Sequence, residues 1–150
     1  MRLSAKHQRS STSGSRIAIA STAAGHAYAA ALGPEAAEAL LVEMEREIPE
    51  SAKLLRPRLD ADRYSLRERG YVTVCGLWSP HINGLAVPLW SPQYQTYVVV
   101  TIGLLANIYD EMRLHKEVAP KILELSASIR TVLEDGESVL FGQRVRGGSL

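Results

Sequence analysis

The sequence has little net charge, few aromatic side chains and a single cysteine. Its 150 residues include 17 Lys and Arg against 16 Asp and Glu, for a formal charge of +1. A chain that gripped nucleic-acid phosphates by itself would need a strongly basic face, and the sequence shows none. With Cys75 alone, neither an intrachain disulfide nor a thiolate metal cluster can form, which fits a reducing, cytoplasmic setting.

Long apolar runs and catalytic motifs are also missing. The apolar stretch at 97–105 is far too short to cross a bilayer, and no apolar signal core follows the polar first residues. The four histidines lack HxH or HExxH spacing, no serine has a GxSxG context, and no glycine-rich phosphate loop is present. We therefore expect no membrane contact, no metal, no cofactor and no enzymatic activity.

Composition divides the chain into a central domain with two flanking segments. Residues 1–15 are rich in Ser, Lys, Arg and Gln, which predicts a mobile N-terminal segment. Residues 16–134 carry the periodic apolar patterns of one domain, and 16–20 alternates weakly like a short strand. Residues 135–150 have no clear period, so we expect a flexible tail after a helix that ends at Asp135-Gly136.

Helices are predicted on both sides of a group of strands. The helix at 21–32 begins on small side chains, can be capped by Ser21 or Thr22, and ends at Gly33. Pro34 opens a second helix with one apolar stripe, residues 51–60 form a connector that can contain helical turns, and a charged helix at 60–69 stops at Gly70. An amphipathic helix at 116–134, with Pro120 in its first turn, closes the domain.

Three consecutive strands are predicted at 71–78, 82–90 and 97–103. Strict alternation places Val72 and Val74 on one face of the sheet, and Tyr71 and Cys75 on the other. The third strand is nearly all apolar, so we expect it to be a central strand covered on both faces.

The order of several short motifs resembles the effector domain of IclR-type bacterial transcriptional regulators. These motifs are Gly-Ser-Arg-Ile at 14–17, Ser-Thr-Ala-Ala-Gly-His-Ala-Tyr at 21–28, Arg-Gly-Tyr at 69–71, Gly-Leu-Ala-Val-Pro at 84–88 and Val-Val-Thr-Ile-Gly at 99–103. The resemblance covers about residues 10–134. It implies an α+β fold, with a GAF-like curved antiparallel sheet flanked by helices.

The resemblance also implies a function. In complete members a winged-helix domain binds operator DNA, and the effector domain binds a small organic acid and supports oligomerisation. We find no winged-helix sequence in this chain, and the resemblance implies that it begins inside the effector domain. We therefore expect a small organic acid effector, a homo-oligomer (dimer or tetramer), and DNA contact only through the absent domain.

The resemblance places the ligand carboxylate against the start of the helix at 21–32. Ala23, Ala24 and Gly25 lack bulk, so backbone N–H groups there are reachable and the helix dipole favours an anion. A competing interpretation is that small residues only let this helix pack tightly on the sheet. The ungapped register places the family's remaining pocket positions at Val74, Gly84, Thr101 and Gly103.

Those four positions suggest a wide, apolar pocket. In relatives that bind small oxo-acids they tend to be an Asp, a Cys and two Ser, whereas only Thr101 keeps a hydroxyl here. Val74 removes a carboxylate, and Gly84 and Gly103 remove bulk. We expect an aromatic or longer-chain acid rather than glyoxylate or pyruvate.

Two other functions stay open at this point. One is a small enzyme on a GAF-like scaffold that uses Cys75 or His26, and the other is an oligomerisation module without a ligand. We expect Cys75 to pack in the core, His26 to be a surface or packing histidine, and His81 and His115 to be solvated. Trp78 and Trp90 either line a pocket or simply end their strands. The sequence does not name the effector, the operator or the direction of regulation.

Overall fold

The computed structural model describes the backbone of residues 18–146 and the side chains of residues 18–135. The expected mobile segment at 1–15 and the last residues of the expected tail, 147–150, lie outside this range. Residues 16 and 17 of the expected short strand also lie outside it. The rest of that segment, Ala18 to Ala20, leads into a turn and is not a strand.

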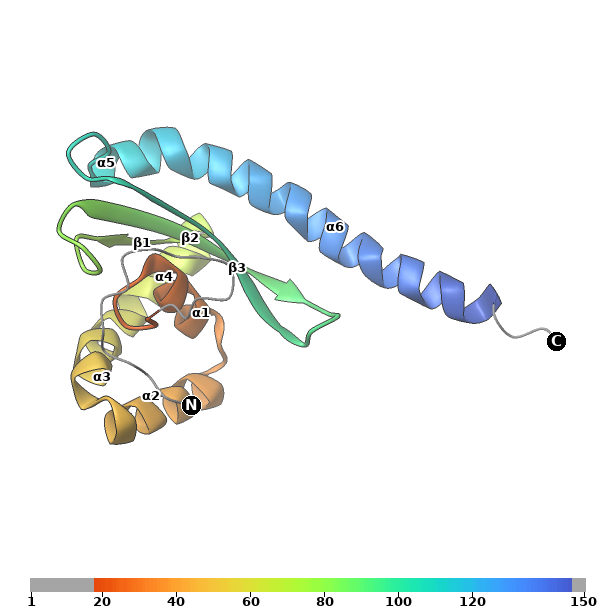
Figure 1. Cartoon of the computed structure of the whole chain (residues 1–150), viewed down its shortest axis with the longest axis horizontal. Coiled ribbons are helices and arrows are strands. Elements are labelled where there is room, and N and C mark those ends of the chain that lie inside the picture. Colours follow the sequence, from red (N-terminus) through yellow and green to blue (C-terminus); the bar gives the residue numbers. More distant parts are fainter. Residues whose placement is uncertain (1–17, 147–150) are drawn as a thin grey trace.

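The sheet has three antiparallel strands in chain order, β1 (Val72–Cys75), β2 (Ile82–Ser91) and β3 (Thr96–Leu105) (Figure 1). This confirms the predicted α+β class and the three consecutive strands. The first strand is shorter than expected because Gly76, at φ 65°, turns the chain out of extended geometry. β3 was expected at the centre, but in the described sheet β2 is central and β3 lies at the edge.

Helices cover both faces of the sheet. On one face, α1 (Ala23–Ala31) packs against Val72, Val74 and Ala86. On the other, α6 (Ala119–Arg146) packs against Leu85 and other β2 side chains. Figure 1 shows α5 and α6 above the sheet and α1, α2, α3 and α4 below it. The expectation that β3 is covered on both faces is wrong, because none of its residues is buried and Thr101, Gly103 and Leu105 are exposed.

A layer of short helices lies against α1. It consists of α2 (Pro34–Glu47), α3 (Pro49–Leu55), the 3-10 turn η1 (Arg56–Arg58) and α4 (Leu59–Arg69). As predicted, Pro34 opens α2 and Gly70 ends α4, with φ 83° in the left-handed region. The residues predicted as a connector are therefore mostly helical, and this layer buries Ala37, Leu41, Met44, Ala52, Leu55 and Leu59.

The C-terminal helical run is longer than expected at both ends. It begins with α5 (Glu111–Arg113), because the side chain of Asp110 accepts a hydrogen bond from the Arg113 amide at 2.8 Å. The π-helical turn η2 (Leu114–Val118) follows, so Pro120 lies well inside the run and not in its first turn. A proline ring crowds the carbonyl four residues earlier, and the wider π-helical turn just before Pro120 gives it room.

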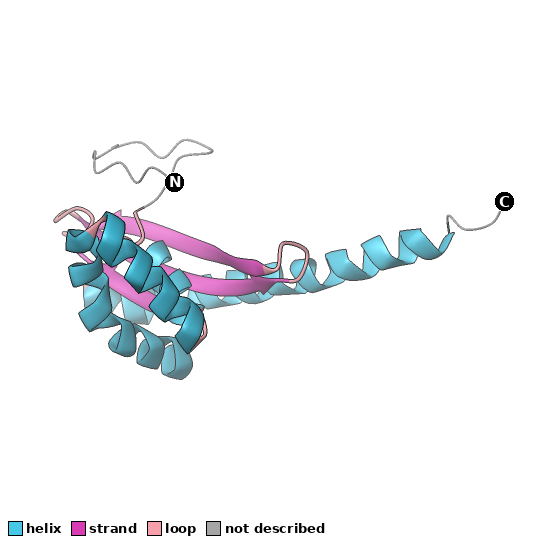
Figure 2. Cartoon of the chain, turned by 90° about the horizontal axis from the view of Figure 1, so that it is seen from below, coloured by secondary structure: helices cyan, strands magenta, loops and turns pink. Residues whose placement is uncertain are grey.

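The expected end of this helix at residues 135–136 is wrong, since α6 continues to Arg146 and passes beyond the β2–β3 hairpin (Figure 2). A single glycine weakens a helix by about 1 kcal/mol and does not by itself end one. No helix within residues 18–146 is both long and apolar enough to cross a membrane.

Candidate functional site

The start of α1 is held by Thr22, one of the two capping residues predicted. Its Oγ1 accepts a hydrogen bond from the Gly25 amide at 3.1 Å and donates one to the Ala18 carbonyl at 2.7 Å. The His26 amide donates to the Thr22 carbonyl at 3.0 Å. Within residues 18–135, the amides of Ala23 and Ala24 have no hydrogen-bond partner, as is usual in the first turn of a helix.

Gly25 is small because the chain passes directly over it. A Cβ built at this position would lie 2.1 Å from the Ile19 carbonyl oxygen and 2.3 Å from its Cα. The amide of Gly25 is already used by the cap, and the residue is buried. At this position the geometry therefore supports the close-packing interpretation.

The sheet positions predicted from the family register share one face with α1. Val74 pairs with Gly84, and Gly84 pairs with Gly103, so these three form a row across the sheet. Thr101 pairs with Ala86 in the next row. Val74, Ala86 and neighbouring Val99 pack in the α1 cluster, which identifies the face. The structure thus brings the predicted residues together on α1 and on the face that it covers.

Access to these residues differs sharply. Ala23, Gly25 and Val74 are buried, and a Cβ at Gly84 would lie 3.0 Å from the Ala23 Cβ. Helix and sheet are in direct contact there, with no space between them for a ligand. A second group of three, Ala24, Thr101 and Gly103, keeps solvent access, and Thr101 Oγ1 donates to the Leu85 carbonyl at 3.2 Å. We name these three residues the open lane.

His26 is fully buried beside this region. Its Nε2 lies 2.8 Å from the Ala20 carbonyl and its Nδ1 lies 2.6 Å from Oδ2 of Asp62. Each ring nitrogen therefore faces an oxygen atom of the protein. Of the two roles expected for His26, packing is the one observed. It ties α4 to the chain just before α1. Sequence spacing carried no signal for Asp62, because the pair spans 36 residues.

The other titratable residues weaken the case for catalysis. Cys75 was expected in the core, but it is exposed at the end of β1, where alternation points it away from α1. Partial burial raises the pKa of its thiol, and the Glu111 carboxylate raises it further, so little thiolate forms at neutral pH. Among residues 18–135, no three His, Cys, Asp or Glu side chains are grouped as metal ligands would be.

The remaining histidines and tryptophans divide between solvent and packing. His81 is exposed as expected, whereas His115 is half-buried and its Nδ1 lies 2.7 Å from the Tyr71 hydroxyl. Trp78 and Trp90 are each nearly half exposed. Trp90 packs edge-on against Tyr97, with ring centroids 5.2 Å apart, on the α1 face of the sheet.

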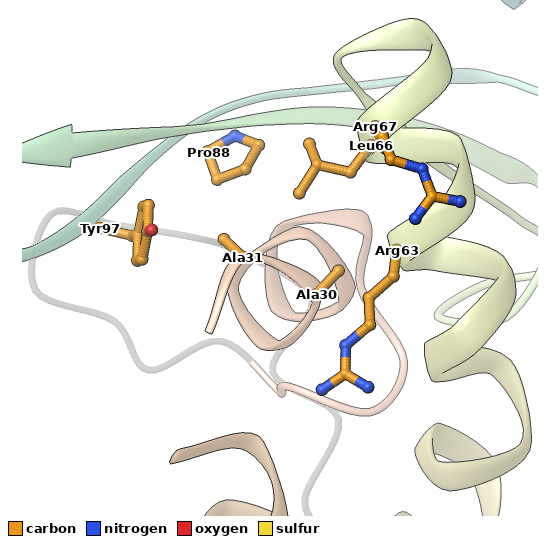
Figure 3. A pocket seen from close by; sticks show the side chains of 7 residues that line it. All are labelled: Ala30, Ala31, Arg63, Leu66, Arg67, Pro88 and Tyr97. Atoms are coloured by element: carbon orange, nitrogen blue, oxygen red, sulfur yellow. The ribbon is translucent and has the colours of Figure 1, made fainter. Parts of the chain in front are cut away.

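A cleft of about 350 Å³ opens at the other end of α1, where α4 and the β2–β3 ladder approach it. We name it the arginine cleft. Figure 3 shows its two guanidinium groups on the α4 side and Tyr97 on the strand side. Its lining residues are Ala30, Ala31, Arg63, Leu66, Arg67, Pro88 and Tyr97. Sequence analysis missed it because these residues lie on four elements that only the tertiary structure brings together.

Comparison with known proteins identifies the fold. Neither the protein-family models nor the curated protein sequences give a match. Among solved structures, an IclR-family transcriptional regulator from Brucella abortus superposes with a TM-score of 0.69 at 24% identity, over 76% of this chain and 43% of that one. A transcriptional regulator from a Rhodococcus species gives 0.69 at 22% identity, over 89% and 55%.

The chain has the fold of IclR-family regulators. It spans about half the length of these two proteins. A third structure with this IclR-type fold is the inducer-binding domain of PobR from Acinetobacter, in complex with 3-hydroxybenzoic acid. It matches at 19% identity with a TM-score of 0.57, over 75% of this chain and 66% of that one. The fold implied by the sequence motifs is therefore confirmed.

Proposed function

We propose that this chain is the effector-binding part of an IclR-type transcriptional regulator and that it binds a small organic acid. The observation that carries the proposal is the open lane, in which Ala24, Thr101 and Gly103 stay accessible beside the first turn of α1. The fold supports it, since a domain of the same fold in PobR binds an aromatic acid.

The ligand would lie over β3, because the space between α1 and β1 is filled. Its carboxylate would face the first turn of α1, where the Ala23 and Ala24 amides and the positive end of the helix dipole favour an anion. Thr101 would supply the hydroxyl contact, since its oxygen keeps acceptor capacity while it donates to Leu85. Val74 would contribute through packing under Ala23 and not by contact with the ligand.

The rest of the lane selects the body of the acid. Ala24 and Gly103 present little bulk, and no charged side chain lies among the predicted site residues. An aromatic or longer-chain acid fits this surface better than glyoxylate or pyruvate. Gly103→Ala tests whether the ligand needs this space. The added Cβ would lie 3.3 Å from Cγ2 of Ile82 and would narrow the open lane.

Regulation would follow from a shift between two arrangements of an oligomer in the cytoplasm. Such a shift requires the acid to bind one arrangement more tightly, by about 1–3 kcal/mol. Operator DNA would be bound by a winged-helix domain and not by this chain, whose 17 basic and 16 acidic side chains nearly cancel. Two features argue against the alternative of a small enzyme. The raised pKa of Cys75 keeps its thiol protonated, and the ring of His26 is buried where a substrate does not reach it.

A thermal-shift screen tests the proposal. A ligand at one hundred times its Kd should add about 2.7 kcal/mol to the free energy of unfolding. Aromatic and medium-chain acids should raise the melting temperature more than two-carbon or three-carbon acids. Thr101→Val should abolish the shift, whereas Thr96→Val, at the far end of the same strand, should keep it. A uniform lack of response, or equal shifts in both variants, would reject the open lane.

A further inference from the structure

The two outer edges of the sheet are built differently. The edge strand β1 is four residues long and ends at Gly76, whose φ of 65° turns the chain away. The edge strand β3 runs for ten residues, and within residues 18–146 no other strand pairs with its outer side. Proteins protect a free edge by keeping it short or by placing charged side chains or proline on it. β3 contains no charged residue and no proline, so its edge lacks these protections.

The ladder with β2 decides which backbone groups of β3 point outward. In an antiparallel pair, residues that exchange hydrogen bonds alternate with residues that do not. Directly after β3, the Ala106 amide donates to the His81 carbonyl at 2.9 Å, so the even-numbered residues of β3 bond to β2. The odd-numbered residues therefore direct their amides and carbonyls to the free edge. These residues are Tyr97, Val99, Thr101, Gly103 and Leu105.

The apolar side chains beside this edge are incompletely covered. The half-buried side chains of β3 on the α6 face are Val98, Val100, Ile102 and Leu104. Leu123 of α6 reaches toward the β1 side, since a Cβ on Gly70 would lie 3.3 Å from its Cδ2. At about 100° per residue, Leu125 and Val132 lie on the opposite side of α6, toward β3. They are 49% and 70% exposed, so an apolar surface continues from α6 to the free edge.

We infer that the free edge of β3 binds the same edge of a second copy of this chain. The two strands run antiparallel about a two-fold axis at Thr101, which places Thr101 opposite the partner's Thr101. This register gives every outward amide and carbonyl of β3 a partner, because the outward residues extend equally far on both sides of Thr101. The two sheets then join into one continuous sheet.

The side chains of β3 are complementary to themselves in this register. On the α6 face, Val100 lies opposite the partner's Ile102, and both are apolar. On the α1 face, the bulk of Val99 lies opposite the partner's Gly103. The two copies of Thr101 form a threonine pair, which is a favourable cross-strand pair. No like charges meet, because β3 carries none. A second copy therefore matches the edge in hydrogen bonding, size and charge.

The size of the contact predicts a weak dimer. A standard stable interface has about 20–30 residues on each side, whereas β3 supplies ten, with the exposed side of α6 next to them. We expect a monomer–dimer equilibrium with a Kd on the order of micromolar. This dimer rests on the proposed function in that it gives the oligomer named there an interface, but it does not require acid binding.

Sedimentation equilibrium on the full chain, without any acid, tests the inference by charge exchange. Thr101→Lys places two lysines opposite each other and should weaken dimerisation at least tenfold, and Thr101→Glu should do the same. An equal mixture of the two variants should restore the dimer, because lysine then lies opposite glutamate. Thr101 is exposed, so neither substitution opens the core, and circular dichroism confirms that each variant is folded.

Thr131 supplies the matched control. It is an exposed threonine on α6, and it lies outside the paired strands. Thr131→Lys and Thr131→Glu should each change the dimer Kd less than twofold, and mixing them should have no effect. Equal weakening by the Thr101 and Thr131 substitutions would show that charge acts without regard to position, which overturns the inference.

Hydrogen exchange of backbone amides, followed by NMR at several protein concentrations, tests the same edge without substitution. The outward amides of Val99, Thr101 and Gly103 should exchange more slowly as the concentration rises. The amides of Val100 and Ile102, which bond to β2, should exchange slowly at every concentration. Protection of the outward amides in the dilute monomer would show that another part of the chain itself covers the edge, and would overturn the inference.

The remaining outcomes separate this inference from the acid site. A monomer at every concentration, or no recovery of the dimer in the mixture of Thr101 variants, would also overturn the inference. If acids still raised the melting temperature of the wild type but not of Thr101→Val, the acid site would stand without the dimer. A dimer that follows the charge exchange, with no response to any acid, would support the inference and reject the acid site alone.

Discussion

Replacement of Gly25 by alanine should destabilise the protein although alanine is the better helix former. The new Cβ would lie 2.1 Å from the Ile19 carbonyl oxygen and 2.5 Å from its carbonyl carbon, closer than real contacts allow. These are backbone atoms, so no side-chain rotation relieves the clash. The peptide of Ile19 has to move away from α1.

The cost can be estimated from what moves with that peptide. Overpacking in a tight site costs about 1–3 kcal/mol. Displacing Ile19 also displaces Ala20, whose carbonyl oxygen is hydrogen-bonded to the buried Nε2 of His26. Loss of that hydrogen bond would leave a buried polar group unsatisfied, which costs about 1–3 kcal/mol. The helix propensity of alanine returns at most about 1 kcal/mol. We expect the free energy of unfolding to fall by about 2–4 kcal/mol.

Urea denaturation followed by circular dichroism measures this loss, with Gly33→Ala as the matched control. A Cβ at Gly33 meets no atom within 4 Å, and its φ of −60° suits alanine. Alanine at position 33 lowers the conformational entropy of the unfolded chain, and this gain offsets its weaker capping of α2. The free energy of unfolding should therefore change by no more than about 0.5 kcal/mol. If both variants unfolded at the wild-type midpoint, the close approach of Ile19 to α1 would be refuted, and close packing would no longer explain the glycine at position 25.

Three further substitutions test other contacts. His26→Ala should lower the free energy of unfolding by about 3 kcal/mol, because it leaves the Asp62 carboxylate, only 12% exposed, without its partner. Urea denaturation measures this loss, and an unchanged midpoint would show that the pair does not stabilise the fold. Gly70→Ala should cost about 1 kcal/mol or more, seen as a lower melting temperature, since φ is 83° and Leu123 Cδ2 would lie 3.3 Å from the new Cβ. Cys75 should react slowly with iodoacetamide at neutral pH, because its raised pKa leaves mostly thiol, and Glu111→Gln should speed the reaction by lowering that pKa. Fast alkylation at neutral pH would revive a nucleophilic role for this residue.

Local chemistry made part of the fold predictable. Pro34, Gly70 and the Thr22 cap act within one turn of the chain, so each marked a helix boundary close to where it is observed. Alternation along β1 also depends on neighbouring residues only, and it correctly separated Val72 and Val74 from Tyr71. The IclR-type register then predicted four sheet positions, Val74, Gly84, Thr101 and Gly103, which do lie on the face that α1 covers.

Properties that depend on distant partners were predicted poorly. The apolar sequence of β3 could not show that it lies at the edge of the described sheet, and the lone Cys75 gave no sign of its exposure. The length of α6 past Asp135 and the early start at Asp110 also escaped the periodicity argument.

By itself, the sequence determined the order of most helices and strands, several of their boundaries, and which side of β1 each residue faces, because turn chemistry and side-chain alternation act over a few residues. Tertiary structure decided which small residues are packed and which stay accessible. Ala23 and Gly25 are covered because Gly84 and the Ile19 backbone approach them, while Ala24 and Thr101 stay accessible. Arg63 and Arg67 form a cleft only because α4 folds back beside α1 and β3, a meeting of distant segments that no local pattern encodes.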